Sequence, residues 1–306
     1  MTIRYYLYKG DRPSDGGRAL IEALQGVQLR SSGSAYRGGR SKAFINWGCT
    51  NSEAARLYNL STLRLNDPMA IAAATNKLIA LGRLAETGVP HVPFWTQENI
   101  QQAYAAVDNG ARVYARTQLT GHSGAGIRLI MSERDPQWAE AANNPFGRWT
   151  VNSEGGTRES LETFRQAFSR CQLFTQGITG QRYEWRVHVF RDRPILTQLK
   201  LRREGFRDTD NYTSLVRNHG TGWVYSVNFD RNHYATESVE ELAIQAINAL
   251  GLDFGAVDII QKRTSGSPAY VLEVNTAPGL EEGGSSLPAY ANAIREWANA
   301  AVQASA

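Results

Sequence analysis

Two short apolar segments near the C-terminus constrain the fold of this 306-residue chain more than any other feature. Gly255–Ile260 and Tyr270–Val274 have the composition of buried β-strands, and the polar loop Lys262–Pro268 lies between them. Strands joined by so short a loop can pair as an antiparallel hairpin. We therefore expect a sheet whose centre includes these two strands.

The predicted hairpin carries an all-oxygen set of polar side chains. Asp258 interrupts an otherwise apolar strand, and Glu273 and Asn275 are two residues apart, so they face the same side of theirs. Two carboxylates and an amide oxygen are hard ligands of the kind that Mg²⁺ prefers. The alternative is that both acids lie on the solvent face of an ordinary hairpin. We favour a metal site, because Asn275 is followed directly by Thr-Ala-Pro-Gly, which ends the strand there.

A glycine-bearing loop, Gln118–Gly126, lies between the predicted strands Arg112–Arg116 and Ile127–Met131. Three glycines and a serine in this loop allow backbone N–H groups to approach a polyphosphate. The glycine spacing matches neither a P-loop nor a dinucleotide fingerprint, and an ordinary hairpin loop has a similar composition. The candidate phosphate-binding residues are Gly121, Ser123, Gly124 and Gly126.

Basic residues are concentrated between Arg182 and Arg207, where eight of them stand against three acids. On alternating strands, Arg186 shares a face with His188, and Lys200 shares one with Arg202. One interpretation is a set of cations around a transferring phosphate. The other is a solvated basic sheet face or a nucleic-acid patch.

Composition narrows the function class without fixing it. A formal charge of +4 and 42% hydrophobic residues are ordinary for a globular protein, and no run of 18 apolar residues predicts a membrane span. Two cysteines, Cys49 and Cys171, cannot form a disulfide framework and lack metal-site spacing, which favours a reducing, cytoplasmic setting. The polar-flanked start of the chain does not have the pattern of a signal peptide.

The order of predicted elements suggests several parts. Strands at Ile3–Tyr8 and Ala43–Trp47, separated by a helix at Arg18–Leu24, predict a small parallel α/β unit. A single helix is predicted over 68–88, and residues 132–157 are left unassigned. Further predicted helices cover Glu98–Asn109, Ser160–Cys171, Ser238–Leu250 and the tail from Pro288; further predicted strands cover Arg186–Phe190 and Pro194–Leu201.

This order resembles the ATP-grasp superfamily of carboxylate–amine ligases, particularly its glutathione synthetase-like and ribosomal-protein S6 glutamate ligase-like branch. The most specific matches are Leu252–Asp258 and Leu272–Leu280, in which asparagine follows the second acid. The resemblance is clearer from Asn66 to Leu280 than over the first 60 residues. Other similar segments are Asn66–Pro68, Asn76–Leu78, Val113–Arg116, Tyr183–Val187, Leu199–Arg203 and Ser214–Asn218.

The resemblance implies an ATP-grasp fold of mixed α/β and α+β class. Its parts would be a small N-terminal α/β domain over 1–66, a central lid over 67–175 and a C-terminal part with the metal site over 176–306. ATP would bind between the last two with Mg²⁺, as two ions. The implied nucleotide-binding residues are Lys77, Arg116, Gln176, Glu184 and the loop residues above; the metal ligands are Asp258, Glu273 and Asn275; and the catalytic cations are Arg186, Lys200, Arg202 and Arg217.

The implied reaction joins a carboxylate to an amine. The carboxylate attacks the γ-phosphate, and the amine of an amino acid, peptide or other molecule displaces phosphate from the acyl phosphate, leaving ADP and phosphate. Two alternatives stay open. One is ligation of an amino acid onto a modified nucleic-acid base, which the basic stretch Arg30–Lys42 with Tyr36 would suit. The other is an ATP-binding module without catalysis. No membrane partner is expected, and a homo-oligomer is left open.

Two positions depart from the family pattern. Arg116 stands where the family usually has lysine, and its forked guanidinium presents a different geometry to phosphate. The hinge Leu173–Ile178 has Gln176 where the family usually offers a glutamate to the ribose. A neutral amide accepts hydrogen bonds from hydroxyl groups less strongly than a carboxylate does. Both departures bear on nucleotide affinity.

Overall fold

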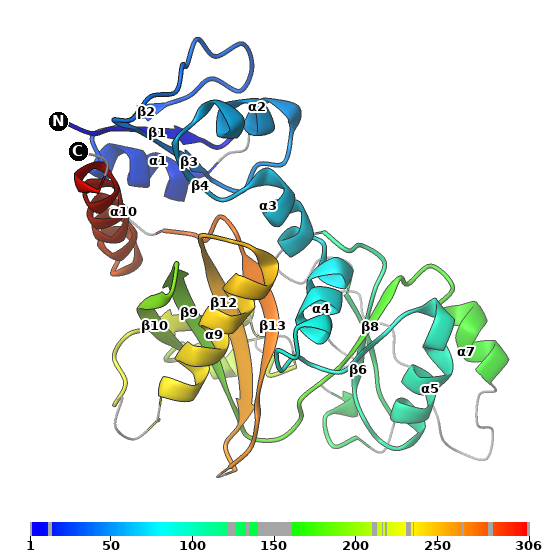
Figure 1. Cartoon of the computed structure of the whole chain (residues 1–306). Helices are drawn as coiled ribbons and strands as arrows, with labels where there is room; N and C mark the ends of the chain where they lie inside the picture. The colour runs from blue at the N-terminus through cyan, green and yellow to red at the C-terminus, as the bar shows by residue number, and fades with distance from the viewer. Residues whose placement is uncertain are drawn as a thin grey trace.

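Three sheets make up the computed structural model, which describes residues 2–11, 14–120, 127–132, 135–139, 161–209, 213–215, 217, 219–230, 234, 236–264, 266–280 and 284–304. Their strand orders are β2-β1-β3-β4, β5-β8-β6-β7 and β11-β10-β9-β12-β13. In Figure 1 the first sheet lies at the top, the second at the lower right and the third at the lower left. The mixed α/β class predicted from the sequence is confirmed.

The N-terminal sheet is parallel throughout, as predicted. Its helices begin at side-chain caps: Ser14 accepts a hydrogen bond from the N–H of Gly17, and Asn51 accepts one from that of Ala54. Its elements are β1 (Arg4–Tyr8), α1 (Asp15–Ala23), β2 (Val27–Gln28), β3 (Lys42–Asn46), α2 (Ser52–Leu60) and β4 (Leu63–Leu65).

The second sheet is antiparallel and packs against two helices. A cluster of aromatic side chains, centred on Phe164, Phe168 and Phe174, fills the space between the sheet and these helices. Its elements are β5 (Phe94–Trp95), η1 (Gln97–Asn99), α5 (Ile100–Asp108), β6 (Val113–Arg116), β7 (Ile127–Ile130), α7 (Leu161–Ala167) and β8 (Leu173–Gln176).

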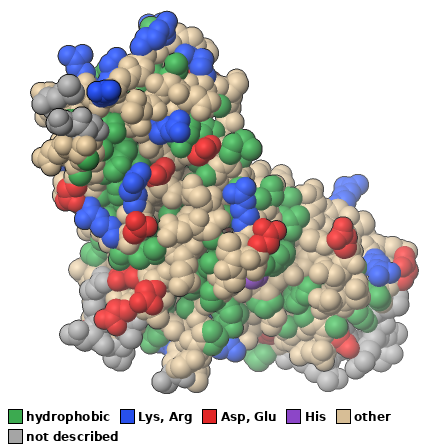
Figure 2. Space-filling view, in the orientation of Figure 1, with side chains coloured by type: hydrophobic (Ala, Val, Ile, Leu, Met, Phe, Trp, Pro, Cys, Tyr) green, Lys and Arg blue, Asp and Glu red, His purple; other side chains and the backbone are tan. Residues whose placement is uncertain are grey.

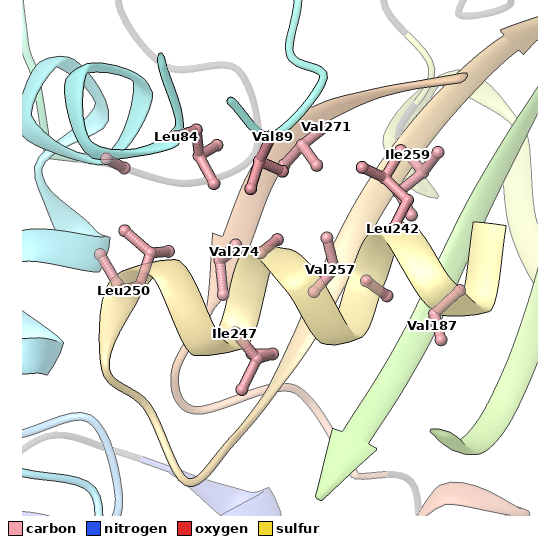
Figure 3. Packing of buried hydrophobic residues seen from close by; sticks show 14 of the residues in the cluster. Leu84, Val89, Val187, Leu242, Ile247, Leu250, Val257, Ile259, Val271 and Val274 are labelled. Atoms are coloured by element: carbon pink, nitrogen blue, oxygen red, sulfur yellow. The ribbon is translucent and has the colours of Figure 1, made fainter. Parts of the chain in front are cut away.

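The third sheet has the most strands, and helix α9 covers one of its faces. Leu242 and Ile247 of α9 pack among the valines of the sheet, including Val187 and Val257 (Figure 3). The other face is left for polar side chains. The elements are β9 (Arg182–Phe190), β10 (Arg193–Arg202), η2 (Phe206–Asp208), η3 (His219–Thr221), β11 (Trp223–Ser226), α9 (Glu237–Leu250), β12 (Phe254–Lys262) and β13 (Ala269–Asn275).

The single helix predicted over 68–88 is wrong. The structure has two helices, α3 (Pro68–Thr75) and α4 (Lys77–Glu86), separated at Asn76, whose ψ of 107° is extended. The Asn76 side chain accepts hydrogen bonds from the N–H groups of Leu78 and Ile79, so it caps the second helix. This break makes Lys77 the first residue of α4.

In two places, elements that are far apart in the chain pack against each other. Leu81 and Leu84 of α4 belong to the same buried cluster as α9 and the third sheet. Helix α10 (Ser286–Gln303) returns beside α1, where Tyr290 and Ile294 share a core with Leu20 (Figure 1). The division of the chain at residues 66 and 175 stays a prediction.

Candidate active site

A cavity of about 820 Å³ lies between the second and third sheets, because residues of both sheets line its wall. It also receives the start of α4 and the start of α10. Ten of the side chains predicted from the sequence line this one cavity: Lys77, Arg116, Gln176, Glu184, Arg186, Lys200, Arg217, Asp258, Glu273 and Asn275.

Alternate residues of β9 form part of the cavity wall. Arg182, Glu184, Arg186 and His188 all line it, as the two-residue period of a strand requires. The residues between them, such as Val187, belong to the buried core on the opposite side. A single strand therefore separates a polar cavity from an apolar core.

Asp258 and Glu273 are direct partners across β12 and β13, so the predicted hairpin is confirmed. The two carboxylates are each held by a cation. Arg186 donates through Nε and Nη2 to both oxygens of Asp258, at 2.7 and 2.8 Å. Lys77 Nζ lies 2.6 Å from Glu273 Oε2. These pairs offset the repulsion between two neighbouring acids.

Asp258 is an ionised carboxylate in this arrangement. Burial raises its pKa, but the charge and hydrogen bonds of Arg186 act in the opposite direction and hold the net pKa below its ordinary value. Burial disfavours the charged form of Arg186 as well, yet Asp258 outweighs it and the pKa of the guanidinium is raised. The pair is therefore fully charged at neutral pH.

A second ionic cluster surrounds Glu184, which is 6% exposed. Its oxygens lie 3.1 Å from Arg182, 3.0 Å from Lys200 and 3.4 Å from Arg217. Burial raises the pKa of Glu184, but the three cations outweigh burial and the net pKa is lowered. Glu184 thus positions Lys200 and Arg217 at the cavity wall.

Arg116 is differently placed from these cations. Its Nε is buried without a hydrogen-bond partner, and no ion pair joins it to any acid in the part of the chain that the structure describes. Burial lowers the pKa of its guanidinium, as expected for a desolvated cation. Arg116 therefore offers an unpartnered hydrogen-bond donor to an anion that enters the cavity.

The hinge side of the cavity is less polar. Gln176 and Gly177 lie at the end of β8, where the N–H of Gln176 donates to the carbonyl of Pro93 at 2.8 Å. Apolar side chains that line the cavity suit a planar, largely apolar ring. These side chains are Leu81, Val92, Leu173, Ile178, Ile260 and Leu272.

The oxygen set fits a hard divalent cation. Each carboxylate oxygen has two acceptor sites, so Asp258 and Glu273 keep acceptor capacity beside their cations. Asn275 Nδ2 is buried and has no hydrogen-bond partner among the described residues. No cluster of three or more His, Cys, Asp and Glu suited to a metal occurs in the described ranges, so the protein ligands on offer here are the two carboxylates and the amide oxygen of Asn275.

One predicted site residue, Arg202, is not brought into the cavity. Arg202 lies exposed at the last position of β10 and does not line the cavity, although Lys200 on the same face does. Gly121, Ser123, Gly124 and Gly126 lie outside the described residues.

Solved structures with the same arrangement cover almost the whole chain. D-Alanine–D-alanine ligase from Bacillus anthracis aligns over 100% of both chains with a TM-score of 0.60 at 12% identity. A RimK domain ATP-grasp protein from Sphaerobacter thermophilus aligns over 96% of this chain and 98% of its own, with a TM-score of 0.55 at 18% identity. The ATP-grasp ligase PsnB, complexed with a minimal precursor, aligns over 97% and 99% with a TM-score of 0.61 at 14% identity.

This chain has the ATP-grasp fold. A curated relative, a probable alpha-L-glutamate ligase from Haemophilus influenzae, is 25% identical over 221 residues, which are 72% of this chain. The match spans 61% of that relative's length. No family model matches the sequence. PsnB with the same fold has also been solved with Mg and ADP.

Within the ATP-grasp cavity, the wall residues that escaped the sequence-based prediction include Tyr225, Trp223 and Gln198. Tyr225 lies under two cations, with the Arg186 guanidinium 4.2 Å and the Lys200 ammonium 4.9 Å from its ring centroid. Trp223 holds the Arg217 guanidinium at 4.2 Å in the same way. Gln198 also lines the cavity. The alternation of side chains along β10 and β11 is the sequence signal that could have identified all three.

The basic stretch Arg30–Lys42 is separate from this cavity. Lys and Arg side chains gather over the N-terminal unit, at the top of Figure 2. Tyr36, however, is 6% exposed and its hydroxyl pairs with that of Ser61 at 3.0 Å. A ring so buried cannot stack on a nucleic-acid base. In the described residues, no helix is both long and apolar enough to cross a membrane.

Proposed function

We propose that this chain is an ATP-dependent carboxylate–amine ligase that forms an amide through an acyl phosphate and releases ADP and phosphate. The fold is that of ATP-grasp ligases, and the proposal extends their class of reaction to this chain. The observation that carries it is the charge arrangement of the cavity. Two adjacent acids, Asp258 and Glu273, stand in a wall where the described basic side chains exceed the acidic ones by six to three.

This excess of positive charge suits a polyphosphate. Lys77, at the start of α4, and Arg116, at the end of β6, would hold its oxygens. Arg116 forms no ion pair with a described acid, and its Nε has no hydrogen-bond partner, so an incoming phosphate oxygen would give this nitrogen an acceptor. The apolar side chains that line the cavity would receive the base, and the Gln176 amide would face the ribose.

Asp258, Glu273 and Asn275 would hold Mg²⁺. When bound, the ion would supply positive charge that offsets the negative charge of the phosphate groups. The protein's own task is to keep the two carboxylates adjacent, which the register of β12 with β13 does. The second ion predicted from the sequence stays a prediction.

Arg186, Lys200 and Arg217 would stabilise negative charge on the reacting carboxylate and phosphoryl group. Each is fixed before substrate arrives: Arg186 by Asp258, and the other two by Glu184. Preorganised cations of this kind need no rearrangement when charge develops, which is the main contribution that a phosphoryl-transfer site makes. Arg202 is exposed, so we assign it no role in this step.

L-Glutamate is the first substrate to test, because the curated relative is a probable alpha-L-glutamate ligase. PsnB was solved with a precursor, so a peptide is the second partner to test. ADP release would be measured with ATP, Mg²⁺ and L-glutamate, alone and with free amino acids, peptides and amine-bearing nucleic acid.

The acyl-phosphate step has a specific isotopic signature. With the carboxylate labelled in ¹⁸O, one labelled oxygen should appear in the released phosphate, because that oxygen forms the bond to phosphorus and leaves with it. ADP release without label in the phosphate would contradict the acyl phosphate. Tight ATP binding with no ADP release from any pair would favour the non-catalytic alternative.

A further inference from the structure

Three hydrogen-bonded residues beside the predicted metal strands, two of them buried, have no part in the proposed role of the cations. His188 on β9, Gln198 on β10 and Tyr290 on α10 form a chain of hydrogen bonds. His188 Nδ1 lies 3.2 Å from the Tyr290 hydroxyl, and His188 Nε2 lies 3.0 Å from Gln198 Oε1. Only Gln198 and the imidazole reach the cavity, since Tyr290 is fully buried.

The buried tyrosine decides the tautomer of the histidine. Tyr290 is 0% exposed, and burial raises the pKa of its hydroxyl, so the phenol keeps its proton. In the described residues, His188 Nδ1 is the only partner of this hydroxyl. If Nδ1 carried hydrogen, the Tyr290 O–H would be a buried donor without an acceptor, which is costly. The Tyr290 hydroxyl therefore donates to Nδ1.

The histidine in turn orients the glutamine. Burial lowers the pKa of His188 to about 4, so the ring is neutral at pH 7 and carries one N–H. With Nδ1 accepting from Tyr290, that hydrogen is on Nε2 and donates to Gln198 Oε1. The assignment follows from satisfying the whole network, the criterion by which tautomers and amide orientations are decided.

One hydrogen-bond donor group of Gln198 has no partner among the described residues. With its oxygen turned toward His188, Gln198 points its Nε2 amino group away from the imidazole, and that nitrogen makes no hydrogen bond to any described residue. Gln198 is the register partner of Arg186, so this donor lies beside the cations of the proposed reaction site. An amide NH₂ fixed in this way recognises an oxygen acceptor and discriminates against a donor.

We propose that the Gln198 amide nitrogen binds a carboxylate oxygen of the amino-acid substrate, and that His188 and Tyr290 are positioning residues that hold this amide in the donating orientation. The proposal rests on the proposed function for the identity of the second ligand. It assigns a specificity subsite for a carboxylate, and the cationic excess of the cavity favours a substrate with that charge.

The first measurement needs no substrate. Long-range ¹H–¹⁵N correlation spectra of the imidazole rings at pH 7 should show His188 as the neutral Nε2–H tautomer. In Tyr290→Phe the donor to Nδ1 is absent, so the tautomer preference should weaken or reverse. A His188 signal of the Nδ1–H form in the wild-type protein would overturn the proposal, because Gln198 would then present its oxygen to the cavity.

The second measurement uses L-glutamate as the probe. With a non-hydrolysable ATP analogue and Mg²⁺ present, L-glutamate should shift the side-chain NH₂ signals of Gln198, while methylamine, which has no carboxylate, should not. Gln198→Leu should weaken L-glutamate binding about 10- to 100-fold, the range for a hydrogen bond to a charged group. Tyr290→Phe should weaken it less. Unshifted Gln198 signals with L-glutamate would overturn the subsite.

Failure of the proposed function has a different signature. The ATP analogue alone should perturb Lys77 and Arg116, and its affinity should be the same in Gln198→Leu as in the wild-type protein. If the nucleotide binds and L-glutamate does not shift the side-chain signals of Gln198, only the subsite is wrong. If the nucleotide does not bind, the ligase proposal is wrong, and the tautomer of His188 still reports on the network.

Discussion

Lys77 and Glu273 are 196 positions apart in the chain and form an ion pair of 2.6 Å at the wall of the cavity. The pair depends on two local features. The break at Asn76 starts α4 at Lys77, and the pairing of β13 with β12 places Glu273 beside Asp258. A cation and a carboxylate that are both proposed to bind ATP·Mg²⁺ therefore satisfy one another before the nucleotide arrives.

Replacement of Lys77 should weaken nucleotide binding. Lys77→Met removes a charged hydrogen-bond donor to phosphate, which corresponds to an affinity loss of about 10- to 100-fold. Calorimetric titration with ATP·Mg²⁺ would measure it. Lys262→Met is the matched control, because Lys262 is exposed at the end of β12 and should leave the affinity unchanged. Equal ATP affinities in both variants would show that Lys77 does not bind the nucleotide.

Arg116 should affect stability and binding in opposite directions. Arg116→Met removes a cation whose Nε is buried without a hydrogen-bond partner, and the cost of burying this group outweighs its attraction to Glu273, so the nucleotide-free protein should gain free energy of unfolding. The same change should weaken ATP binding, and Arg116→Lys should retain much of it. Urea denaturation and calorimetry would test the two effects. Unchanged affinity in Arg116→Met would show that the guanidinium does not meet phosphate.

His188 should make the protein less stable in mild acid. Its pKa is lowered from 6.5 to about 4 by burial, so between these values the unfolded chain binds a proton that the folded chain does not. Stability from this group is present above pH 6.5 and falls as the pH falls. The loss should reach about 2 kcal/mol by pH 5. Urea denaturation of His188→Asn should show a flatter dependence over this range; an equally steep one would contradict the assignment.

Glu184 should be critical for folding. In Glu184→Gln, Arg182, Lys200 and Arg217 lose the carboxylate that they share, and removing one partner of a buried ionic cluster typically costs about 3–5 kcal/mol. The loss would be measured by urea denaturation at pH 7. The control Glu204→Gln alters an exposed acid and should cost little. Because the pKa of Glu184 is lowered by folding, its contribution should disappear as the pH falls below about 4.

The acidic hairpin was predictable because its signals are local. Two strands joined by a short loop leave few pairings, and alternation places Glu273 and Asn275 on one face. The same reasoning failed for Arg202. Alternation predicts the face of the sheet on which a side chain lies, but it does not predict where along β10 the strand extends beyond the cavity. The glycine loop stays a prediction.

The break at Asn76 and the network of His188 were not predictable in the same way. A single asparagine within an apolar segment is compatible with a continuous helix, and only tertiary packing selects the cap over the helix interior. His188 and Tyr290 are 102 residues apart, on elements that no sequence period relates. Helix α2 was missed although Asn51 followed by Glu53 is a recognisable N-terminal signal.

The central claim is that the acidic pair binds metal for phosphoryl transfer, and Glu273→Gln tests it most directly. The change keeps the size of the side chain and removes its charge. ADP release, measured with the substrate pair that the wild-type protein uses, should fall by about 10²–10³-fold, as for loss of one electrostatic partner of a transition state. ATP affinity should fall far less, because Lys77 and Arg116 remain. Equal turnover in the variant and the wild-type protein would contradict the metal site and the account built on it.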